Sequence, residues 1–237
     1  MVAERGASVL LQVHRGLQSL LRCVPGADAV LESDEAVPPF DLQCSLMSLP
    51  LAFRTELASI VASVPHLFAE PQRVAAWHER LGPRRGMRIG IVWSGNPSHA
   101  NDHNRSIPLE LLSGILSRHD IDFHMLQIVA READRAALEG LPQLRNHIAA
   151  LAEMADTAAL MSLLDLVITV DTAAAHLGGA LGLPAWVMLP WAADWRWMLD
   201  RTDTPWYPTI RLFRQARRGD WGGVLADVAQ ALDRWSL

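Results

Sequence analysis

The residues best suited to chemistry follow an apolar, β-branched run at residues 166–170. Asp171 and Thr172 end that run, Ala173 begins a segment of small residues, and His176 lies one helical turn further on. This order predicts a strand, a helix closed by a Gly-Leu-Pro sequence, and a second strand. The carboxyl end of the first strand and the N-terminus of the helix then share one edge of the sheet, where anionic ligands commonly bind. Asp171, Thr172, Ala173 and His176 are therefore candidate contacts for a phosphate group.

Arg105 supplies the positive charge that such a site requires. A metal-free site can stabilise a departing diphosphate with a helix N-terminus and an arginine, and Arg105 and His176 suit that task. The alternative interpretation is structural: Asp171 or Thr172 only caps the helix, and His176 is a partly buried surface histidine. For the helix alone the structural interpretation is as good as the binding site or better, and the motifs around the helix favour the binding site.

Two further groups of residues are candidates for the same site. Ser94, Gly95 and Asn96 follow an apolar run and precede a proline, which predicts a tight turn whose backbone amides face a ligand. Such a sequence is also common in ordinary loops. Trp195 and Arg196 follow another predicted strand, and indole faces stack on sugar rings and bases as well as filling cores. Of Trp195 and its neighbour Trp197, one is expected to face a cleft and the other to pack inward.

The elements that must position these residues alternate between apolar runs and helical patterns. The alternation predicts an α/β fold with a parallel sheet covered by helices on both faces. Strands are predicted at residues 8–13, 29–32, 41–45, 87–93, 122–128, 146–149, 165–170, 185–189 and 210–213. Helices are predicted at residues 16–23, 71–81, 109–117, 131–139, 157–164, 172–181 and 220–235.

A Gly-Pro-Arg-Arg-Gly sequence at residues 82–86 indicates a domain boundary before the strongest new strand. Residues 83–237 contain enough strands and helices for one complete Rossmann-like domain. Residues 1–82 offer three predicted strands, which is short for the same architecture. We therefore expect a partial N-terminal Rossmann-like domain followed by a complete one.

The composition is that of a globular chain with ample material for a core. The 237 residues are 50% hydrophobic and 20% charged, with a formal net charge of -5, which argues against a general nucleic-acid binder. The apolar runs are shorter than the roughly 20 residues that a membrane-spanning helix needs, and the N-terminus lacks the apolar core of a signal peptide. We expect a cytoplasmic protein without stable membrane insertion, in which Cys23 and Cys44 are buried thiols.

Metal binding is not expected. His99 and His103 share a polar loop, but a metal site would need further ligands from elsewhere. The Asp120-Ile121-Asp122 sequence imitates an acidic metal-binding pair, yet it falls at a helix-to-strand turn on the far edge of the predicted sheet, where turn chemistry explains both carboxylates. We therefore assign no metal ligand and no cofactor.

Several separated motifs, taken together, resemble a known family. The segments 170–177, 93–96 and 104–108 are similar to the C-terminal half of glycosyltransferase family 9, the lipopolysaccharide heptosyltransferases. With residues 194–197 and 205–208 included, the chain more closely resembles the glycosyltransferase-like modules of bacterial tetratricopeptide-repeat proteins. The resemblance extends from Ser8 to the C-terminus.

The resemblance implies a GT-B architecture, in which two Rossmann-like domains face each other across a cleft. Asp171, Thr172, Ala173 and His176 would line the diphosphate and ribose of a nucleotide-sugar donor, and Arg105 would reach its phosphates. Ala173 stands where heptosyltransferases commonly have glycine, which restricts how closely a phosphate approaches the backbone. The resemblance also places the last helix against the N-terminal domain, near Leu49, Leu51 and Phe53.

The N-terminal end departs from the family pattern. Residues 1–6 lead directly into what resembles the second or third strand, and a glycine-rich Gly-Asp loop facing the acceptor is missing, so the chain is expected to be truncated in front. The catalytic residues therefore stay unassigned. Our hypothesis is a metal-independent, inverting sugar transferase that binds a nucleotide-diphosphate sugar and an acceptor that is a saccharide, a lipid-linked glycan or a protein. The alternatives are a non-catalytic binding or interaction module and a nucleotide-sugar epimerase.

Overall fold

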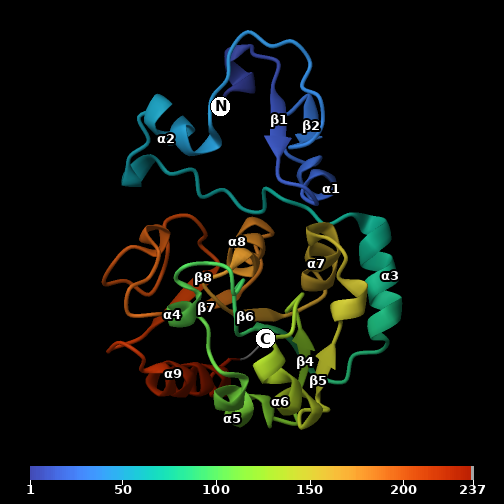
Figure 1. Ribbon diagram of the computed structural model, residues 1–237, viewed down its shortest axis with the longest axis vertical. Coiled ribbons are helices and arrows are strands. Elements are labelled where there is room, and N and C mark those ends of the chain that lie inside the picture. The colour runs from blue at the N-terminus through green and yellow to red at the C-terminus, as the bar shows by residue number, and fades with distance from the viewer. Residues whose placement is uncertain (236–237) are drawn as a thin grey trace.

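A parallel sheet forms the centre of the larger part of the protein (Figure 1). The computed structural model describes residues 1–235. Within that range the sheet has six strands in the order β5-β4-β3-β6-β7-β8, and every neighbouring pair is parallel. The strands are β3 (Met87–Val92), β4 (Ile121–Met125), β5 (Leu144–Asn146), β6 (Leu166–Val170), β7 (Ala185–Leu189) and β8 (Ile210–Arg214). The reversal of strand order between β3 and β6 is the place where ligands bind in open sheets of this kind.

Helices cover both faces of this sheet. One face packs on α3 (Pro71–Leu81), α7 (Met154–Met161) and α8 (Ala173–Ala180), and the other on η4 (Leu109–Leu112), α5 (Ser113–Leu116) and α9 (Trp221–Asp233). Every residue of β6 and β7 is buried. Strands buried on both faces need continuous apolar runs rather than alternating ones, and residues 166–170 and 185–189 are such runs. The predicted α/β fold is confirmed.

The remaining helical segments are short and lie in the connections. They are α4 (Asp102–Arg105), η5 (Glu132–Asp134), α6 (Arg135–Glu139), η6 (Ile148–Ala150) and η7 (Trp195–Trp197). Three of these segments, α4, η5 and η7, follow the carboxyl ends of β3, β4 and β7. The loops at that edge therefore carry the polar residues that the sheet positions.

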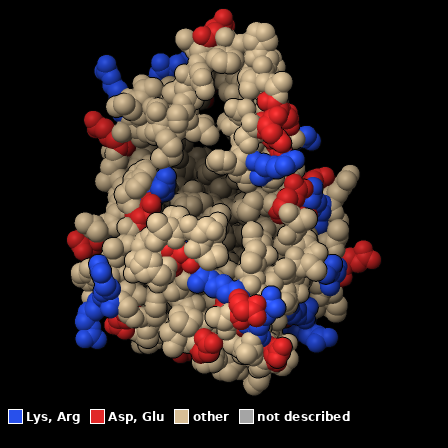
Figure 2. Space-filling model, viewed as in Figure 1, with Lys and Arg blue, Asp and Glu red and all other residues tan. Residues whose placement is uncertain are grey.

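The N-terminal part is small and less buried. It has η1 (Ala3–Arg5), β1 (Leu10–Val13), α1 (Gln18–Leu21), β2 (Ala29–Glu32), η2 (Leu46–Ser48), α2 (Leu49–Ala52) and η3 (Leu57–Ser59), and β1 pairs in parallel with β2. Figure 1 shows these elements beyond the ends of α7 and α8, and Figure 2 shows the surface hollowed between them and the larger part. The backbone N–H groups of His66 and Leu67 donate to the carbonyl oxygen of Ala180, which ties the connecting segment to α8. The boundary predicted at residues 82–83 falls in the turn between α3 and β3, and α3 itself packs on α7.

Three sequence predictions about the fold are wrong. Cys23 and Cys44 are not buried thiols: Cys23 is partly buried and Cys44 is exposed, because Cys44 lies in a segment that packs on neither of the described sheets. Residues 41–45 do not form a strand: they follow Pro38 and Pro39, which offer no backbone N–H, and the side chain of Leu42 is 92% exposed. The last helix does not pack on Leu49, Leu51 and Phe53. Its apolar stripe instead contacts the face of the sheet that carries Ile168 and Met188, because α9 follows β8 directly and that face needs a cover.

Candidate functional site

The predicted site residues gather at the carboxyl edge of the large sheet, around the switch point between β3 and β6. Arg105 reaches from α4 and donates through Nη1 to the backbone oxygen of Asp171, 2.8 Å away. This bond joins the loop after β3 to the loop after β6. The bond therefore holds two loops together that are far apart in the sequence.

Gly95 lies directly beneath the Arg105 guanidinium. A Cβ atom added at Gly95 would lie 2.5 Å from Nη2 of Arg105, which is closer than any side chain tolerates. A larger residue at this position would therefore displace the Arg105 guanidinium, whereas the backbone conformation itself does not need glycine. The N–H of Gly95 donates to Oγ of Ser106 at 3.0 Å, and the N–H of Ser94 is directed to Oε1 of Gln127. These two amides are thus bonded within the protein, which differs from the expectation that they face a ligand.

Asn96 is the third residue of that turn and is exposed. Its Oδ1 accepts the N–H of Ser98 at 2.9 Å, an arrangement typical of a turn. His99 of the same loop accepts the N–H of Asn101 through Nδ1, so this histidine also has a role in the loop. The structure therefore brings Gly95 close to Arg105 and leaves Asn96 at the surface.

Arg131 and Asp102 hold Arg105 in place, and sequence reasoning missed both. Asp102 is 4% exposed, and its carboxylate accepts from Nε of Arg105 and from Nη2 of Arg131. Arg131 also donates to Oγ of Ser106 at 2.9 Å and to the carbonyl oxygen of Gly95 at 3.2 Å. A buried carboxylate between two guanidinium groups fixes both of them. The position of Arg131, just after the carboxyl end of β4, is the signal that could have identified it.

Two backbone N–H groups at the N-terminus of α8 have no acceptor among the described residues. Thr172 stands at the N-cap in an extended conformation, but its side chain does not cap the helix and instead contacts Oγ1 of Thr169 at 3.1 Å. The N–H of Ala175 donates to the carbonyl oxygen of Thr172. Among the described residues, the N–H groups of Ala173 and Ala174 have no hydrogen-bond acceptor. Two free amides at a helix N-terminus are suited to bind an anion.

Asp171 is oriented by a tryptophan. Nε1 of Trp197 donates to Oδ1 of Asp171 at 2.8 Å, and Trp197 is fully buried. The ring of His176 stacks on Trp197 with centroids 5.0 Å apart, and Nδ1 of His176 lies 3.3 Å from the hydroxyl of Tyr207. Burial lowers the pKa of His176 below its ordinary value, although the nearby carboxylate of Asp171 opposes that shift. His176 is therefore a neutral packing and hydrogen-bonding group at neutral pH.

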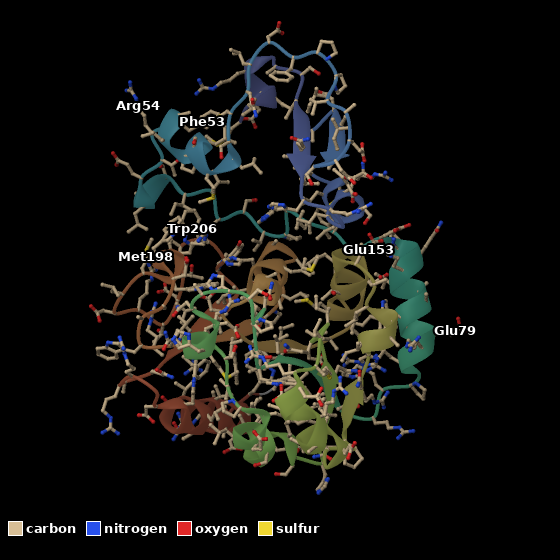
Figure 3. The ribbon with its side chains drawn as sticks, in the orientation of Figure 1. Phe53, Arg54, Glu79, Glu153, Met198 and Trp206 are labelled. Atoms are coloured by element: carbon tan, nitrogen blue, oxygen red, sulfur yellow. The ribbon has the colours of Figure 1, made fainter. Side chains whose placement is uncertain are left out.

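Arg196 faces the N-terminal part, and Trp195 lies beside it. Trp195 is 60% exposed whereas Trp197 is buried, which decides which of the two packs inward. The Arg196 guanidinium lies 4.5 Å from the centroid of the Trp195 ring and donates to Asp194, and its Nη2 is 3.7 Å from Sδ of Met47. Trp206, which sequence analysis did not single out, donates through Nε1 to the carbonyl oxygen of Arg196. Figure 3 shows Trp206 and Met198 on the larger part, below Phe53 of the N-terminal part.

The sequence Asp120-Ile121-Asp122 lies at the opposite edge of the sheet. β4 begins at Ile121, and Asp122 pairs with Arg145 of β5 at 2.7 Å. These carboxylates are therefore remote from the loops that carry Arg105 and Asp171. Their predicted position, at a helix-to-strand turn, is confirmed.

Comparisons with known proteins address the fold and the family. No protein-family model matches the chain. Protein FlbA of Caulobacter vibrioides is 34% identical over 173 residues, which are 69% of this chain and 28% of FlbA, so the chain spans less than a third of that relative. No helix of residues 1–235 is both long and apolar enough to cross a membrane.

Three solved structures are similar. The glycosyl transferase family 9 structure from Veillonella parvula matches with a TM-score of 0.62 at 13% identity, over 98% of this chain and 90% of that one. The Escherichia coli ADP-heptose lipopolysaccharide heptosyltransferase II has a TM-score of 0.47 at 12% identity, over 71% of this chain and 54% of that one. Escherichia coli heptosyltransferase WaaC with ADP has a TM-score of 0.45 at 16% identity, over 68% and 47%. The match to the Veillonella parvula structure shows that this chain has the GT-B-like fold of a family 9 glycosyltransferase.

Proposed function

We propose that the chain binds a nucleotide-diphosphate sugar at the carboxyl edge of the large sheet, as a glycosyltransferase of family 9 type. One observation carries the proposal: the free N–H groups of Ala173 and Ala174 lie next to Asp171, whose backbone oxygen holds the guanidinium of Arg105. A helix N-terminus and an adjacent arginine form a site for a diphosphate.

The residues around these amides would hold the rest of the donor. Asp171 and Thr172 flank the phosphate position, and His176 with Trp197 keeps Asp171 oriented. Trp195, with its exposed indole, and Arg196 border the hollow toward the N-terminal part. We assign the sugar or the base to that side, because an exposed indole is suited to stack on a ring.

The reaction this arrangement supports is a metal-independent transfer of the sugar with inversion. When the bond between the anomeric carbon and the diphosphate breaks, negative charge develops on the leaving phosphate. The amides of α8 and Arg105 are fixed before that charge appears, which is the condition for effective electrostatic stabilisation. We propose a saccharide, lipid-linked glycan or protein as the acceptor.

A second candidate function is binding without catalysis. The transfer needs a base for the acceptor hydroxyl, and the carboxylates of the site already have partners: Asp171 accepts from Trp197, Asp102 from two arginines, and Asp194 from Arg196. This observation favours a module that retains the donor pocket and acts as an interaction partner. The sugar-transfer proposal also includes the division into residues 1–82 and 83–237. In that proposal the acceptor binds on the N-terminal side.

Calorimetric titration with ADP, UDP, GDP and CMP tests the donor site. One nucleotide is expected to bind, and Arg105→Ala is expected to weaken it about tenfold, the effect of losing one charged hydrogen bond. Arg217→Ala is the matched control, because its side chain is 86% exposed and pairs with Asp220 rather than with a residue of the site. Failure of all four nucleotides to bind a folded protein would contradict the proposal.

A further inference from the structure

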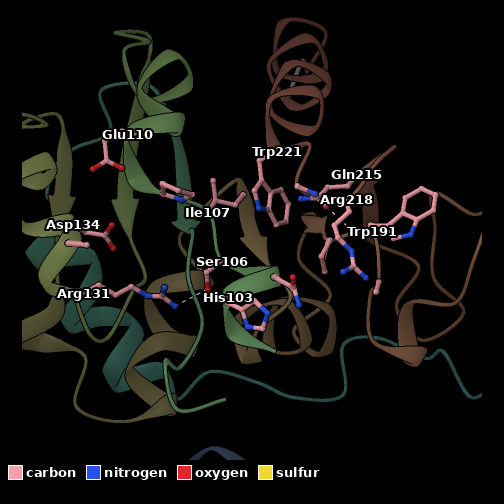
Figure 4. Close-up of a pocket in the computed structure, with 16 residues that line it drawn as sticks. His103, Ser106, Ile107, Glu110, Arg131, Asp134, Trp191, Gln215, Arg218 and Trp221 are labelled. Atoms are coloured by element: carbon pink, nitrogen blue, oxygen red, sulfur yellow. Dashed lines mark hydrogen bonds between the residues drawn. The ribbon is translucent and has the colours of Figure 1, made fainter. Parts of the chain in front are cut away.

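A second pocket opens at the carboxyl edge of the sheet, on the side of α9 (Figure 4). Its volume is about 470 Å³, within the range of small-molecule sites. The pocket is lined by the loops that follow β3, β4, β7 and β8. Arg105 and Asp171 are not among its lining residues. It is therefore distinct from the proposed donor site, although Ser106 and Arg131 lie in both surroundings.

The deep wall of the pocket is apolar. Trp221 at the start of α9 is 7% exposed and Ile107 is 2% exposed, and both line the pocket. Figure 4 shows Trp221 between Arg131 on one side and Arg218 on the other. The small part of the indole that reaches the pocket offers an apolar contact within a polar surround.

Gln215 leaves a hydrogen-bond donor unused. The residue is 4% exposed, and its Oε1 accepts the N–H of Trp191 at 3.1 Å and the N–H of Gly219 at 2.9 Å. Its Nε2 is buried and has no acceptor within the described part of the chain. A buried donor without a partner lowers the free energy of unfolding. We therefore expect a ligand oxygen or a water molecule to accept from Nε2.

The charged groups of the lining have both signs. Arg218 and Arg131 are basic, and Glu110 and Asp134 are acidic, but Oδ2 of the buried Asp134 already accepts from Nε1 of Trp93 at 2.8 Å. The guanidinium of Arg131 already binds the carboxylate of Asp102, so it does not add a free positive charge. A phosphate or a carboxylate would meet the repulsion of Glu110, and a cation would meet that of Arg218. A hydroxyl group both donates and accepts, so a ligand with many hydroxyls can satisfy both kinds of group.

We propose that this pocket binds a saccharide of one or two rings. A ring face packs on Trp221, hydroxyl groups accept from Arg218 and Gln215, and another hydroxyl donates to Glu110. The proposal does not depend on the donor site, because the groups assigned to the saccharide, Trp221, Arg218, Gln215 and Glu110, are not those assigned to the donor.

The test uses the full chain and a panel of glucose, galactose, mannose, N-acetylglucosamine and glucuronic acid, with their common disaccharides. Saturation-transfer NMR detects binding, and calorimetry measures the affinity. Arg218→Ala and Glu110→Gln are each expected to weaken the saccharide that binds best by about tenfold, the effect of losing a charged hydrogen bond. Both side chains are exposed, so neither change removes core packing.

Two matched variants serve as controls. Arg217→Ala changes the neighbouring arginine, and Glu139→Gln changes an exposed glutamate of α6, and neither residue lines the pocket. Both controls are expected to keep full saccharide affinity. The proposal is overturned if no member of the panel binds the folded protein, if the controls weaken binding as much as the pocket variants, or if inorganic phosphate competes with the saccharide. Nucleotide binding is measured separately on the same samples, so failure of one site is distinguished from failure of the other.

Discussion

Trp197 donates its indole N–H to the carboxylate of Asp171 across 2.8 Å, and this bond links the loop after β7 to the N-terminus of α8. Trp197 is itself fixed, because it is fully buried and its ring stacks on His176. The position of Asp171 beside the free amides of α8 is thus determined by core packing. A residue that touches no ligand controls the geometry of the proposed donor site.

Replacement of Trp197 by phenylalanine is expected to destabilise the protein by about 2–3 kcal/mol. The variant loses a hydrogen bond to a charged acceptor and leaves part of the indole volume unfilled. Chemical denaturation measures the free energy of unfolding. The control is Trp195→Phe, which changes an exposed indole and should stay within about 0.5 kcal/mol of the wild type. An equal loss of unfolding free energy in both variants would show that the bond from Trp197 to Asp171 does not stabilise the protein.

Gly95→Ala is expected to weaken nucleotide binding about tenfold. The new Cβ would overlap the Arg105 guanidinium and displace it from the backbone oxygen of Asp171. Calorimetry with the nucleotide that binds the wild type measures the change. Gly114→Ala is the control, because a Cβ there meets no atom within 4 Å. Full affinity in Gly95→Ala would mean that Arg105 makes no contact with the nucleotide.

Stability is expected to fall on acidification between about pH 6.5 and pH 4. His124 and His147 are buried with ring nitrogens 3.0 Å apart, and burial lowers the pKa of each to about 4. Below pH 6.5 the unfolded chain therefore binds protons that the folded protein excludes, so the free energy of unfolding decreases as the pH falls. The expected slope is on the order of 1 kcal/mol per pH unit for each histidine.

Urea unfolding at a series of pH values tests this expectation. Replacement of His124 by leucine is expected to lower the baseline stability and to flatten the slope below pH 6.5. His119→Gln, at an exposed position, is expected to keep the slope of the wild type. A wild-type slope that is unchanged in the His124 variant would exclude the buried pair as its source.

Nucleotide affinity is expected to be the same in EDTA and in Mg²⁺. Arg105 and the amides of α8 supply the positive charge, and residues 1–235 contain no group of three or more His, Cys, Asp or Glu side chains that could hold a metal ion. Parallel titrations in the two buffers measure the difference. Binding that requires Mg²⁺ would contradict a site built from Arg105 and the helix alone.

Most of the large sheet could be predicted because its strands are buried on both faces. In this sheet β7 has the predicted bounds and β6 begins one residue later than predicted. In the separate two-stranded sheet, β2 also has the predicted bounds. α7 begins at Met154 rather than at residue 157, because Glu153 and Asp156 form a capping box that starts the helix earlier. The strand predicted at residues 41–45 does not form, since a strand also needs a paired neighbour, which a local pattern does not reveal.

The sequence predicts which loops form the candidate site, but it does not predict the contacts within these loops. Asp171 and Arg105 are near each other because both follow adjacent parallel strands, which the order of the elements indicates. The partners Asp102 and Arg131 and the bond from Trp197 to Asp171 were missed, since these contacts depend on the path of irregular loops and on side-chain rotamers. The exposure of Trp195 and the burial of Trp197 also depend on the turn of η7 rather than on sequence spacing.

The central claim is that a diphosphate binds at the free amides of Ala173 and Ala174. Amide NMR spectra of the isotopically labelled protein, recorded during titration with the nucleotide diphosphate and with the corresponding nucleoside, test it most directly. We expect the N–H resonances of Ala173 and Ala174 to shift with the nucleotide diphosphate and not with the nucleoside, and Arg105→Ala to reduce the response. Resonances that stay unchanged at saturating nucleotide diphosphate would contradict it.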